Sequence, residues 1–417
     1  MIRFVILASL MPLAVMGPAT AQDVDRDRAE SQAAGQAGEA DRLFKRGEFE
    51  AALPIYEAER ASRATLGDVR YEAYALRAIG ICRAELGDDE GGIEAWAAAR
   101  LLDLKREDKG YAGYDDFLIA QAELRLGRAG DAIASLDRAF PLLSQAVDRD
   151  HEVDARLVLT RTLVTLGRAE EARSHVARAL TLAGELGDAW RLADAWASAG
   201  QVEGALGQAS LALERFSDAQ DAFEEQGRAA EAAWMQTTSA STLILLGRPD
   251  LALARFQEAA SIHEHLDDAG SLSEDLAAIA GLYLEANHLD AALDAARKAV
   301  DKARDADDRA REVEGRVRLA QVQGARGDWP GAAETLAEAV DLIRQVAHDD
   351  PAEQVRLLLT TAEADHRAGQ EIKALERFES ARRTANEAKS EILRRIVADA
   401  RKRFDDREQV PKRPLAP

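Results

Sequence analysis

Small and apolar side chains recur along this chain at a spacing that fits amphipathic helices separated by short turns. One turn in every forty residues carries a glycine, and a second, acidic turn lies midway between successive glycines. The glycine column consists of Gly47, Gly87, Gly127, Gly167, Gly207, Gly247, Gly327 and Gly369, with Asn287 in the place of one glycine. A period held over so many residues indicates stacked supersecondary units rather than the core of a globular enzyme.

Each repeat also has a fixed arrangement of small and bulky positions. Small residues stand seven residues before the turn glycine and five and twelve residues after it, and a mostly bulky column lies between the last two. The first small column is Ala40, Gly80, Ala120, Thr160, Gly200, Ala240, Ala280, Ala320 and Ala362. The bulky column is Tyr56, Trp96, Leu136, Val176, Phe216, Phe256, Ala296, Leu336 and Phe378. Bulky side chains flanked by small ones let two helices approach closely, so each repeat is predicted to be a helix pair.

The two turns of a repeat carry different capping residues. Glycine suits the left-handed backbone that follows a helix C-terminus. Aspartate accepts hydrogen bonds from the free N–H groups at a helix N-terminus, and Pro351 after Asp350 suits a first helical turn. The acidic column is Asp68, Asp108, Asp148, Asp188, Asp268 and Asp308, interrupted at Arg228 and His348. Each repeat is therefore predicted to read helix, glycine turn, helix, acidic turn.

This pattern resembles the tetratricopeptide repeat. The matching positions are the small residue (Gly80, Gly200), the alanine pair (Ala212 with Ala219, Ala252 with Ala259), the aromatic between them (Phe216, Phe256) and a first tryptophan (Trp196). The usual repeat has about 34 residues, so this one is longer, and it lacks the family's closing proline. The resemblance implies an all-α solenoid of about nine helix pairs over residues 33–390, wound into a right-handed superhelix. Longer repeats of this kind look like those of peptide receptors and cargo adaptors.

The segments outside the array have their own patterns. Residues 1–21 have the layout of a secretory signal peptide, with Arg3 before a short apolar run and small residues before the cut. An uncleaved membrane anchor is the alternative, but the run is short for a membrane span. Residues 22–32 are expected to be a flexible leader, 391–408 a C-terminal capping helix or a docking helix for a partner, and 409–417 a disordered tail. The first repeat has Glu59 in a small column, a deviation expected of a terminal repeat that exposes one face to water.

Composition limits the partners and the location of the protein. The net charge is −21, so the chain repels phosphate backbones and anionic lipids, and nucleic-acid binding is disfavoured. We expect no stable membrane insertion after the signal is removed. The alanine- and arginine-rich composition points to a bacterium, so export to the periplasm is expected, with secretion as the alternative. Cys82 is the only cysteine, and it is expected to be a small buried hydrophobe.

Catalytic and metal-binding patterns do not emerge from the sequence. It has no phosphate-binding glycine loop, no His-Glu-x-x-His and no Gly-x-Ser-x-Gly. His263 and His265 are two residues apart, which separates them by about 200° around a helix, and a third ligand is not evident. We therefore expect no catalytic residue, no metal and no cofactor.

Candidate partner-binding residues follow from the resemblance, because the first helix of each tetratricopeptide repeat lines a concave groove. They are Tyr74, Arg77, Tyr114, Phe117, Gln121, Arg125, Arg161, Gln201 and Trp234. Tyr, Trp and Arg are common interface anchors, and Arg77, Arg125 and Arg161 are expected to form a basic strip for a carboxylate-bearing peptide. The acidity of the whole chain instead favours a basic partner. The alternative at each position is that aromatics pack between helices and arginines pair with nearby acids.

Three functional hypotheses remain open from the sequence. The leading one is an exported adaptor that binds a protein or peptide in the groove, without catalysis. The second is an assembly protein of an envelope complex that uses its ends and convex face. The third is an enzyme with an unrecognised site.

Overall fold

The computed structural model describes residues 21–346 and 350–408. The expected signal peptide, apart from its last residue, and the expected tail lie outside the described residues. Over the described ranges the chain forms nineteen α-helices and no strand, which confirms the all-α repeat architecture. It divides into two compact parts, Met1–Arg191 (the N-terminal part) and Leu192–Pro417 (the C-terminal part).

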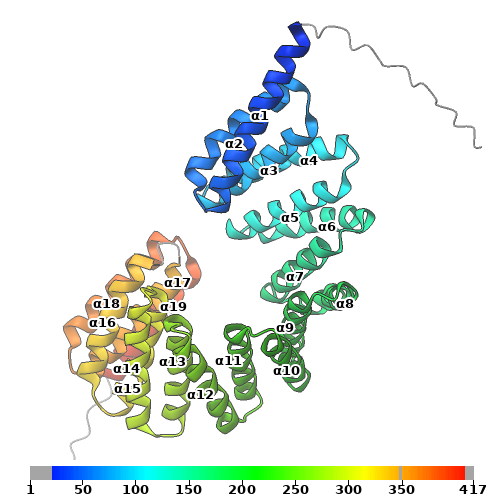
Figure 1. The fold of residues 1–417 in the computed structure, drawn as a ribbon. Coiled ribbons are helices and arrows are strands. Elements are labelled where there is room, and N and C mark those ends of the chain that lie inside the picture. Colours follow the sequence, from blue (N-terminus) through cyan, green and yellow to red (C-terminus); the bar gives the residue numbers. More distant parts are fainter. Residues whose placement is uncertain (1–20, 347–349, 409–417) are drawn as a thin grey trace, which may run out of the picture. The chain divides into compact units, whose positions relative to one another are not determined.

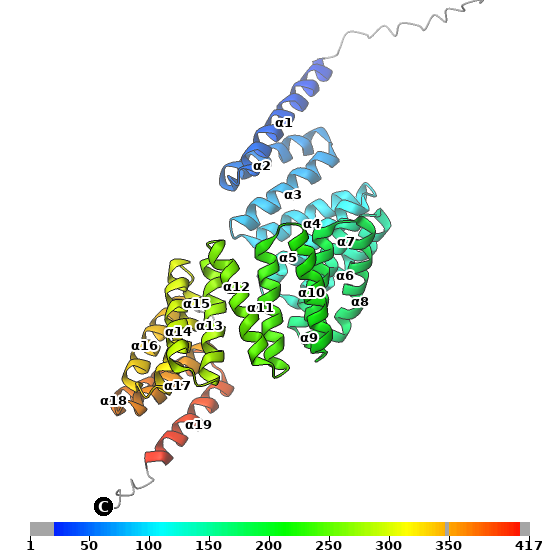
Figure 2. The ribbon, with the colours of Figure 1, turned by 60° about the horizontal axis from the view of Figure 1, so that its bottom comes forward.

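Helices follow one another in antiparallel pairs joined by short turns, and odd-numbered helices are the first of their repeats (Figure 1). The N-terminal part contains α1 (Ala21–Lys45), α2 (Phe49–Leu66), α3 (Val69–Glu85), α4 (Asp89–Lys105), α5 (Lys109–Arg125), α6 (Ala129–Ala146), α7 (Arg149–Thr165) and α8 (Ala169–Leu186). Helix α9 (Ala189–Ala205) spans the boundary. The C-terminal part continues with α10 (Ala209–Glu225), α11 (Ala229–Leu245), α12 (Pro249–His265), α13 (Ala269–Glu285), α14 (Leu289–Asp305), α15 (Arg309–Ala325), α16 (Trp329–Val346), α17 (Pro351–Arg367), α18 (Glu371–Glu387) and α19 (Glu391–Glu408). Figure 2 shows α13 to α16 side by side within this part.

Both kinds of turn have the same backbone geometry. At the glycine turns the residues of the glycine column have a left-handed backbone, as at Gly87 (φ 86°) and Asn287 (φ 60°). This conformation confirms the predicted C-terminal caps. The acidic turns are also left-handed, at residues such as Glu107 (φ 60°) and Val147 (φ 58°) that give no glycine signal. Up to Gly327 the backbone therefore repeats every twenty residues, although the sequence repeats every forty.

The acidic column caps the first helices as predicted. The Asp268 carboxylate accepts the backbone N–H of Ser271 at 3.0 Å, and Asp308 accepts that of Arg311 at the same distance. The same cap is present at Asp68, Asp108, Asp148 and Asp188. At Arg228, where the column is interrupted, no side-chain cap forms on α11.

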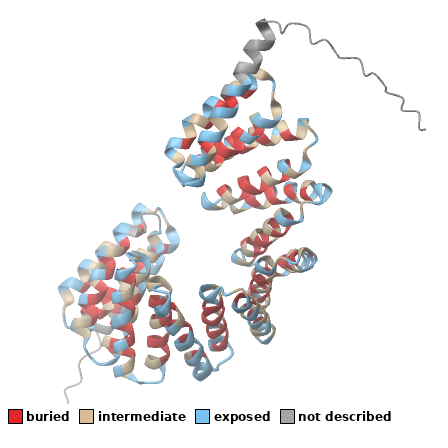
Figure 3. Cartoon of the chain, viewed as in Figure 1, coloured by how far each residue is buried: buried red, intermediate tan, exposed pale blue. Residues whose placement is uncertain are grey.

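The small and bulky columns meet in the core, as the sequence pattern predicts. A Cβ added to Gly80 would lie 2.4 Å from the Trp96 ring, and one added to Gly200 would lie 2.4 Å from the Phe216 ring. The ring therefore occupies the space that a side chain at the glycine would need. Each helix carries its buried residues on the sides that face its neighbours (Figure 3).

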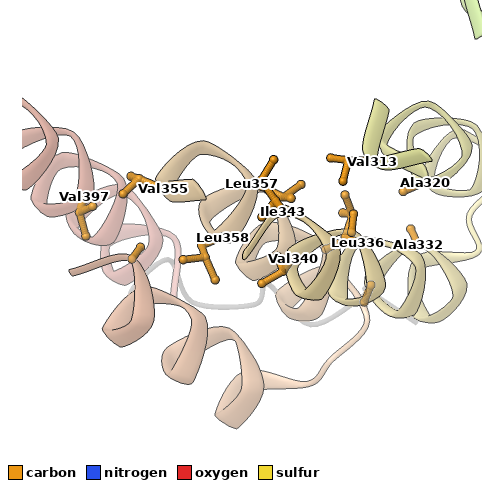
Figure 4. Packing of buried hydrophobic residues seen from close by; sticks show 14 of the residues in the cluster. Val313, Ala320, Ala332, Leu336, Val340, Ile343, Val355, Leu357, Leu358 and Val397 are labelled. Atoms are coloured by element: carbon orange, nitrogen blue, oxygen red, sulfur yellow. The ribbon is translucent and has the colours of Figure 1, made fainter. Parts of the chain in front are cut away.

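The core consists of local clusters that join neighbouring repeats, as expected for a quasi-one-dimensional array. In the last cluster, Leu336, Val340 and Leu358 pack together with Val397 of α19 (Figure 4). Helix α19 also buries Phe404, whose ring makes an edge contact with Phe378 at 5.1 Å. It thus covers the end of the last repeat, over the bounds expected for the capping helix.

The start of the array differs from the sequence expectation in two ways. Residues 22–32, expected to be a flexible leader, are helical and extend α1 backwards. Glu59, expected on a water-exposed face, is fully buried. Its nearest cation is Arg63, whose Nε lies 3.5 Å from Oε1, and burial raises the pKa of Glu59 to about 7.

Candidate partner-binding site

Three first helices of the N-terminal part, α3, α5 and α7, present one continuous face. Arg77 on α3 bonds Asp115 on α5 at 2.6 Å, and the Tyr114 ring on α5 lies 4.2 Å from the His151 ring on α7. Partly exposed residues recur on each helix at helical spacing, as at Tyr114, Gln121 and Arg125 of α5. We call this surface the first-helix face.

A depression of about 480 Å³ lies on this face between the C-terminal halves of α5 and α7. It brings together three of the predicted residues, Gln121, Arg125 and Arg161. Its other lining residues are mostly apolar or small: Leu124, Gly127, Ala129, Val158, Thr162, Thr165 and Leu166. The volume falls in the range of pockets that accept a small ligand or a side chain. Two guanidinium groups beside an apolar wall suit a ligand that carries a carboxylate next to an apolar group.

Arg125 is only partly available at this depression. Its guanidinium contacts Asp89 of α4, with Nη2 2.6 Å from Oδ1, while the side chain remains about half exposed. The Asp89 side chain is only 12% exposed, but the exposed guanidinium remains open to a ligand carboxylate that competes with it.

The prediction of a basic strip of three arginines is wrong at Arg77. Its side chain is buried, with Nη2 2.5 Å from Asp103 and Nε 2.6 Å from Asp115. Both carboxylates are fully buried, and buried charges persist only when they are paired. Burial raises the pKa of Asp115 to about 7, against the opposing effect of Arg77. Phe117 is likewise buried between helices rather than open to a ligand.

Aromatic side chains occupy the N-terminal half of the same face. The predicted residues Tyr74 and Tyr114 are there, with the Tyr74 hydroxyl donating to Asp41 at 2.8 Å. Sequence reasoning missed Tyr71 and Tyr111, which are 46% and 50% exposed. The sequence does indicate both residues, because each precedes a predicted tyrosine by three residues and the two are forty residues apart.

The last two predicted residues belong to the C-terminal part. Gln201 is partly exposed on α9, and Trp234 is 46% exposed on α11. A separate groove of about 700 Å³ in this part lies over α12, α13 and α14, away from the predicted residues. Leu272, Leu276 and Ile279 line it, and the Gln257 amide donates to the Tyr283 hydroxyl there at 3.0 Å.

The two histidines and the cysteine considered for metal binding or nucleophilic chemistry have structural roles in the fold. His263 is buried, with Nδ1 2.7 Å from one oxygen of Asp275, whose other oxygen accepts the Thr237 hydroxyl at 2.7 Å. His265 turns to the Ser261 carbonyl instead. Cys82 is buried as predicted, and burial raises the pKa of its thiol to about 11, which disfavours the reactive thiolate.

The described residues offer neither a metal-binding cluster nor a membrane-spanning helix. They contain no group of three or more His, Cys, Asp or Glu side chains arranged to hold a metal ion. Within the same ranges, every helix is too short or too polar to cross a bilayer.

The helix pairs, their left-handed turns and the small and bulky columns define a tetratricopeptide-type solenoid, which confirms the resemblance. More specifically, the chain belongs to the family described as the MalT-like TPR region, whose model matches residues 188–411, more than half of the chain. A search of curated proteins returned no match.

Several solved structures have a similar fold. The apo form of RapI has a TM-score of 0.60 at 15% identity, over 90% of this chain and 98% of its own. A Rap protein complexed with Competence and Sporulation Factor has a TM-score of 0.50 at 16% identity, over 89% and 99%. A signal-transduction ATPase with a tetratricopeptide repeat sensor from Pyrococcus horikoshii has a TM-score of 0.57 at 14% identity, over 88% of this chain. This chain spans only 55% of that ATPase, and at these identities the likeness concerns the fold alone.

Proposed function

We propose that this chain is an exported adaptor that binds a protein or peptide partner through the first-helix face of its N-terminal part, without catalysis. The observation that carries the proposal is the depression that joins Gln121, Arg125 and Arg161. It offers directed polar groups beside apolar wall residues, the combination that interface anchors use. The Rap protein solved with Competence and Sporulation Factor supports it as a chain of similar fold that takes a partner.

Export is part of the proposal and rests on the sequence of residues 1–21. A cell carrying the full chain should contain the shortened protein in its envelope fraction, whereas a chain that starts at Gln22 should stay in the cytoplasm. Cell fractionation with mass determination of the N-terminus measures this. Recovery of the uncut chain in the cytoplasm would refute export.

Partner binding is tested with the full chain, affinity-tagged and cross-linked in its own cells. The parent is compared with an Arg125→Ala/Arg161→Ala variant, and partners are identified by mass spectrometry and re-tested as purified proteins. The matched control is Arg168→Ala, which removes an exposed arginine that pairs with Glu171 in the turn before α8. The proposal expects a purified partner to lose at least tenfold in affinity for the double variant and to keep its affinity for the control. Equal binding to all three proteins would move the site away from this face.

The groove over α12, α13 and α14 favours the second hypothesis, an assembly protein that acts through its convex face. α12 and α14 are second helices, which lie outside the concave groove in tetratricopeptide arrays. Ser261 is exposed on its wall, so Ser261→Arg should obstruct the groove without disturbing the core. A partner lost by Ser261→Arg and kept by the double arginine variant would favour this hypothesis over the first.

A further inference from the structure

The groove of about 700 Å³ over α12, α13 and α14 has a counterpart in the N-terminal part. A depression of about 440 Å³ lies over α2, α3 and α4, and many of the residues that line the two stand at equivalent positions, five repeats apart. Leu76 and Ile79 of α3 line the N-terminal depression, as Leu276 and Ile279 of α13 line the C-terminal groove. A hollow between two second helices, over the first helix that separates them, therefore occurs in both parts.

The two hollows differ in the side chains that cross them. In the N-terminal one, Arg83 reaches from α3 to Glu57 of α2, with Nη2 3.1 Å from Oε1, and the long side chain of Arg60 lies beside this pair. The residues at these three positions in the C-terminal groove are Tyr283, Gln257 and Ala260. Charged side chains therefore span the first hollow, whereas an alanine and an uncharged Gln257–Tyr283 contact leave the second one larger.

The C-terminal groove is long enough for about four turns of a helix. Its lining on α14 runs from Ala291 to Asp305, which corresponds to about 21 Å at 1.5 Å per residue. Leu272, Leu276 and Ile279 of α13 line it with apolar groups. Amphipathic helices with apolar residues three or four positions apart bind in grooves of this kind. The dimensions and lining of the groove therefore suit a short amphipathic helix.

One end of this groove is acidic. Because α12 and α14 each pack antiparallel to α13, they run in the same direction and their last turns lie at the same end. Glu264 of α12 and Asp301 and Asp305 of α14 line this end, and all three side chains are exposed. Lys302 lies there as well, with Nζ 3.5 Å from Oδ2 of Asp305, so the end keeps a net negative charge. A helix bound in the groove should therefore place cations at this end.

Helix α19 of this chain has these properties on its exposed side. Ile392 and Ile396 are one helical turn apart and are 74% and 44% exposed. Leu393 and Val397 on the other side of α19 are buried in the last core cluster, so the two isoleucines face away from the core of their own copy (Figure 4). The exposed side continues to Arg403, which is three turns from Ile392 and therefore on the same face, about 17 Å away.

We propose that the groove over α12, α13 and α14 binds the exposed side of α19 from a second copy of this chain. α19 lies in the same direction as α12 and α14, so that its isoleucines cover Ile279 and Leu276. Lys402 and Arg403, both exposed near the end of α19, then lie beside the acidic end of the groove. The contact is separate from the proposed function, because it joins two copies and leaves the first-helix face to the partner.

The same direction also places the remaining charges of the contact opposite each other. Asp399 lies on the exposed face of α19 between the isoleucines and Arg403. Lys298 lies on α14 one turn before the acidic end of the groove. Each copy carries both the helix and the groove, so a pair of copies can make the contact twice, as in a two-fold dimer.

Sedimentation equilibrium of the purified full chain measures this contact. Physiological salt screens charges beyond about 8 Å, which limits the general repulsion between two copies of net charge −21. We expect a mass above that of the monomer, rising with concentration towards that of a dimer. Ile392→Asp/Ile396→Asp should weaken the association at least tenfold. The matched control is Ile372→Asp, at a 76% exposed isoleucine of α18, which should associate like the parent. Thermal melts verify that the variants are folded.

A charge exchange tests whether these two surfaces contact each other. Lys402→Glu/Arg403→Glu sets like charges against the acidic end of the groove and should weaken the association at least tenfold. Asp301→Lys/Asp305→Lys should weaken it as well, because it sets cations against cations. The chain with all four substitutions again has opposite charges across the contact and should associate within threefold of the parent. Loss in both double variants without recovery in the fourfold variant overturns the pairing of these surfaces.

A parent chain that stays monomeric overturns the inference, also when a different protein is found in the groove. Association that Ile392→Asp/Ile396→Asp or the groove-obstructing Ser261→Arg retains overturns it too, because the copies then meet elsewhere. The proposed function fails separately, when Arg125→Ala/Arg161→Ala keeps the affinity for a purified partner.

Discussion

The first helices of the N-terminal and C-terminal parts share one backbone pattern and differ in what they expose. At the position of Tyr71, Tyr111 and His151, the following repeats carry no aromatic side chain but Arg191, Glu231, Ser271 and Arg311. The buried columns hardly change between the parts: Tyr56 and Trp96 in one correspond to Phe216 and Phe256 in the other, and all four are buried. The comparison shows that packing restricts the residue type in some columns of the repeat and leaves the exposed columns free to vary.

The largest expected effect concerns a residue that the sequence assigned to the surface and the structure places in the core. Arg77→Ala leaves Asp103 and Asp115 buried without their shared cation, so the free energy of unfolding should fall by about 3–5 kcal/mol. The matched control is Arg125→Ala, whose partly exposed pair with Asp89 is worth about 1 kcal/mol. Urea denaturation measures both, and equal losses would show that Arg77 is not a core residue.

The C-terminal part should respond through its small column. Ala212→Leu or Ala252→Leu inserts three carbon atoms into a fully buried position beside Phe216 or Phe256, and should cost about 1–3 kcal/mol by overpacking. Leu251→Ala, at an exposed neighbouring position, is the control. Melting temperatures that match the parent would contradict the helix-pair packing described here.

Together with Asp115, Glu59 in the first repeat should contribute to the pH dependence of stability. Burial raises its pKa to about 7, further raised by Asp41 and Asp68 and opposed by Arg63, so the folded chain holds the proton more tightly than the unfolded chain. The stability from the neutral form is complete below the unfolded pKa, near 4.3, and is lost as the pH rises through about 7. Between pH 5 and pH 8 the parent should lose more stability than Glu59→Gln, by on the order of 2 kcal/mol.

Calorimetric melts at the two pH values provide the measurement for Glu59. The exposed Glu50 on the same helix is the control, and Glu50→Gln should follow the parent. A parent curve that parallels that of Glu59→Gln would show that Glu59 does not titrate in this range.

The smallest effects on the free energy of unfolding are expected at exposed aromatic side chains of the first helices, which do not pack in the core. Tyr71→Ala and Trp234→Ala should each change the free energy of unfolding by less than about 1 kcal/mol, because both side chains are nearly half exposed. Tyr56→Ala, which empties a buried position of the bulky column, should cost about 3–5 kcal/mol. A large loss at Tyr71 would assign that ring to the core instead of the surface.

Much of the fold was predictable because its determinants are local and repeated. The glycine column, the aspartate caps and the small residues opposite bulky ones lie within one repeat, where spacing alone reveals them. The left-handed residues at Glu107 and Val147 were not predictable in this way, because no glycine stands there and the hydrogen bonds that close the turn impose the conformation.

The candidate site was predictable only in part. Gln121, Arg125 and Arg161, which the resemblance assigned to a groove, line one depression. The burial of Arg77 depends on Asp103 and Asp115, which lie 26 and 38 residues away on other helices, so no local pattern contains it. The setting of Tyr111 depends in the same way on Arg77, because the fold places its Cζ 4.6 Å from the centre of the Tyr111 ring.

The identical geometry of the two turns bears on how such a chain lengthens in evolution. A duplication of twenty residues would leave every turn intact, since the backbone accepts one more helix at any junction. Such a duplication would also turn every later first helix into a second helix and the reverse. The small and bulky columns would then no longer lie opposite each other. Growth by whole repeats of two helices keeps these side-chain matches, whereas the turn backbone alone would also accept a single helix.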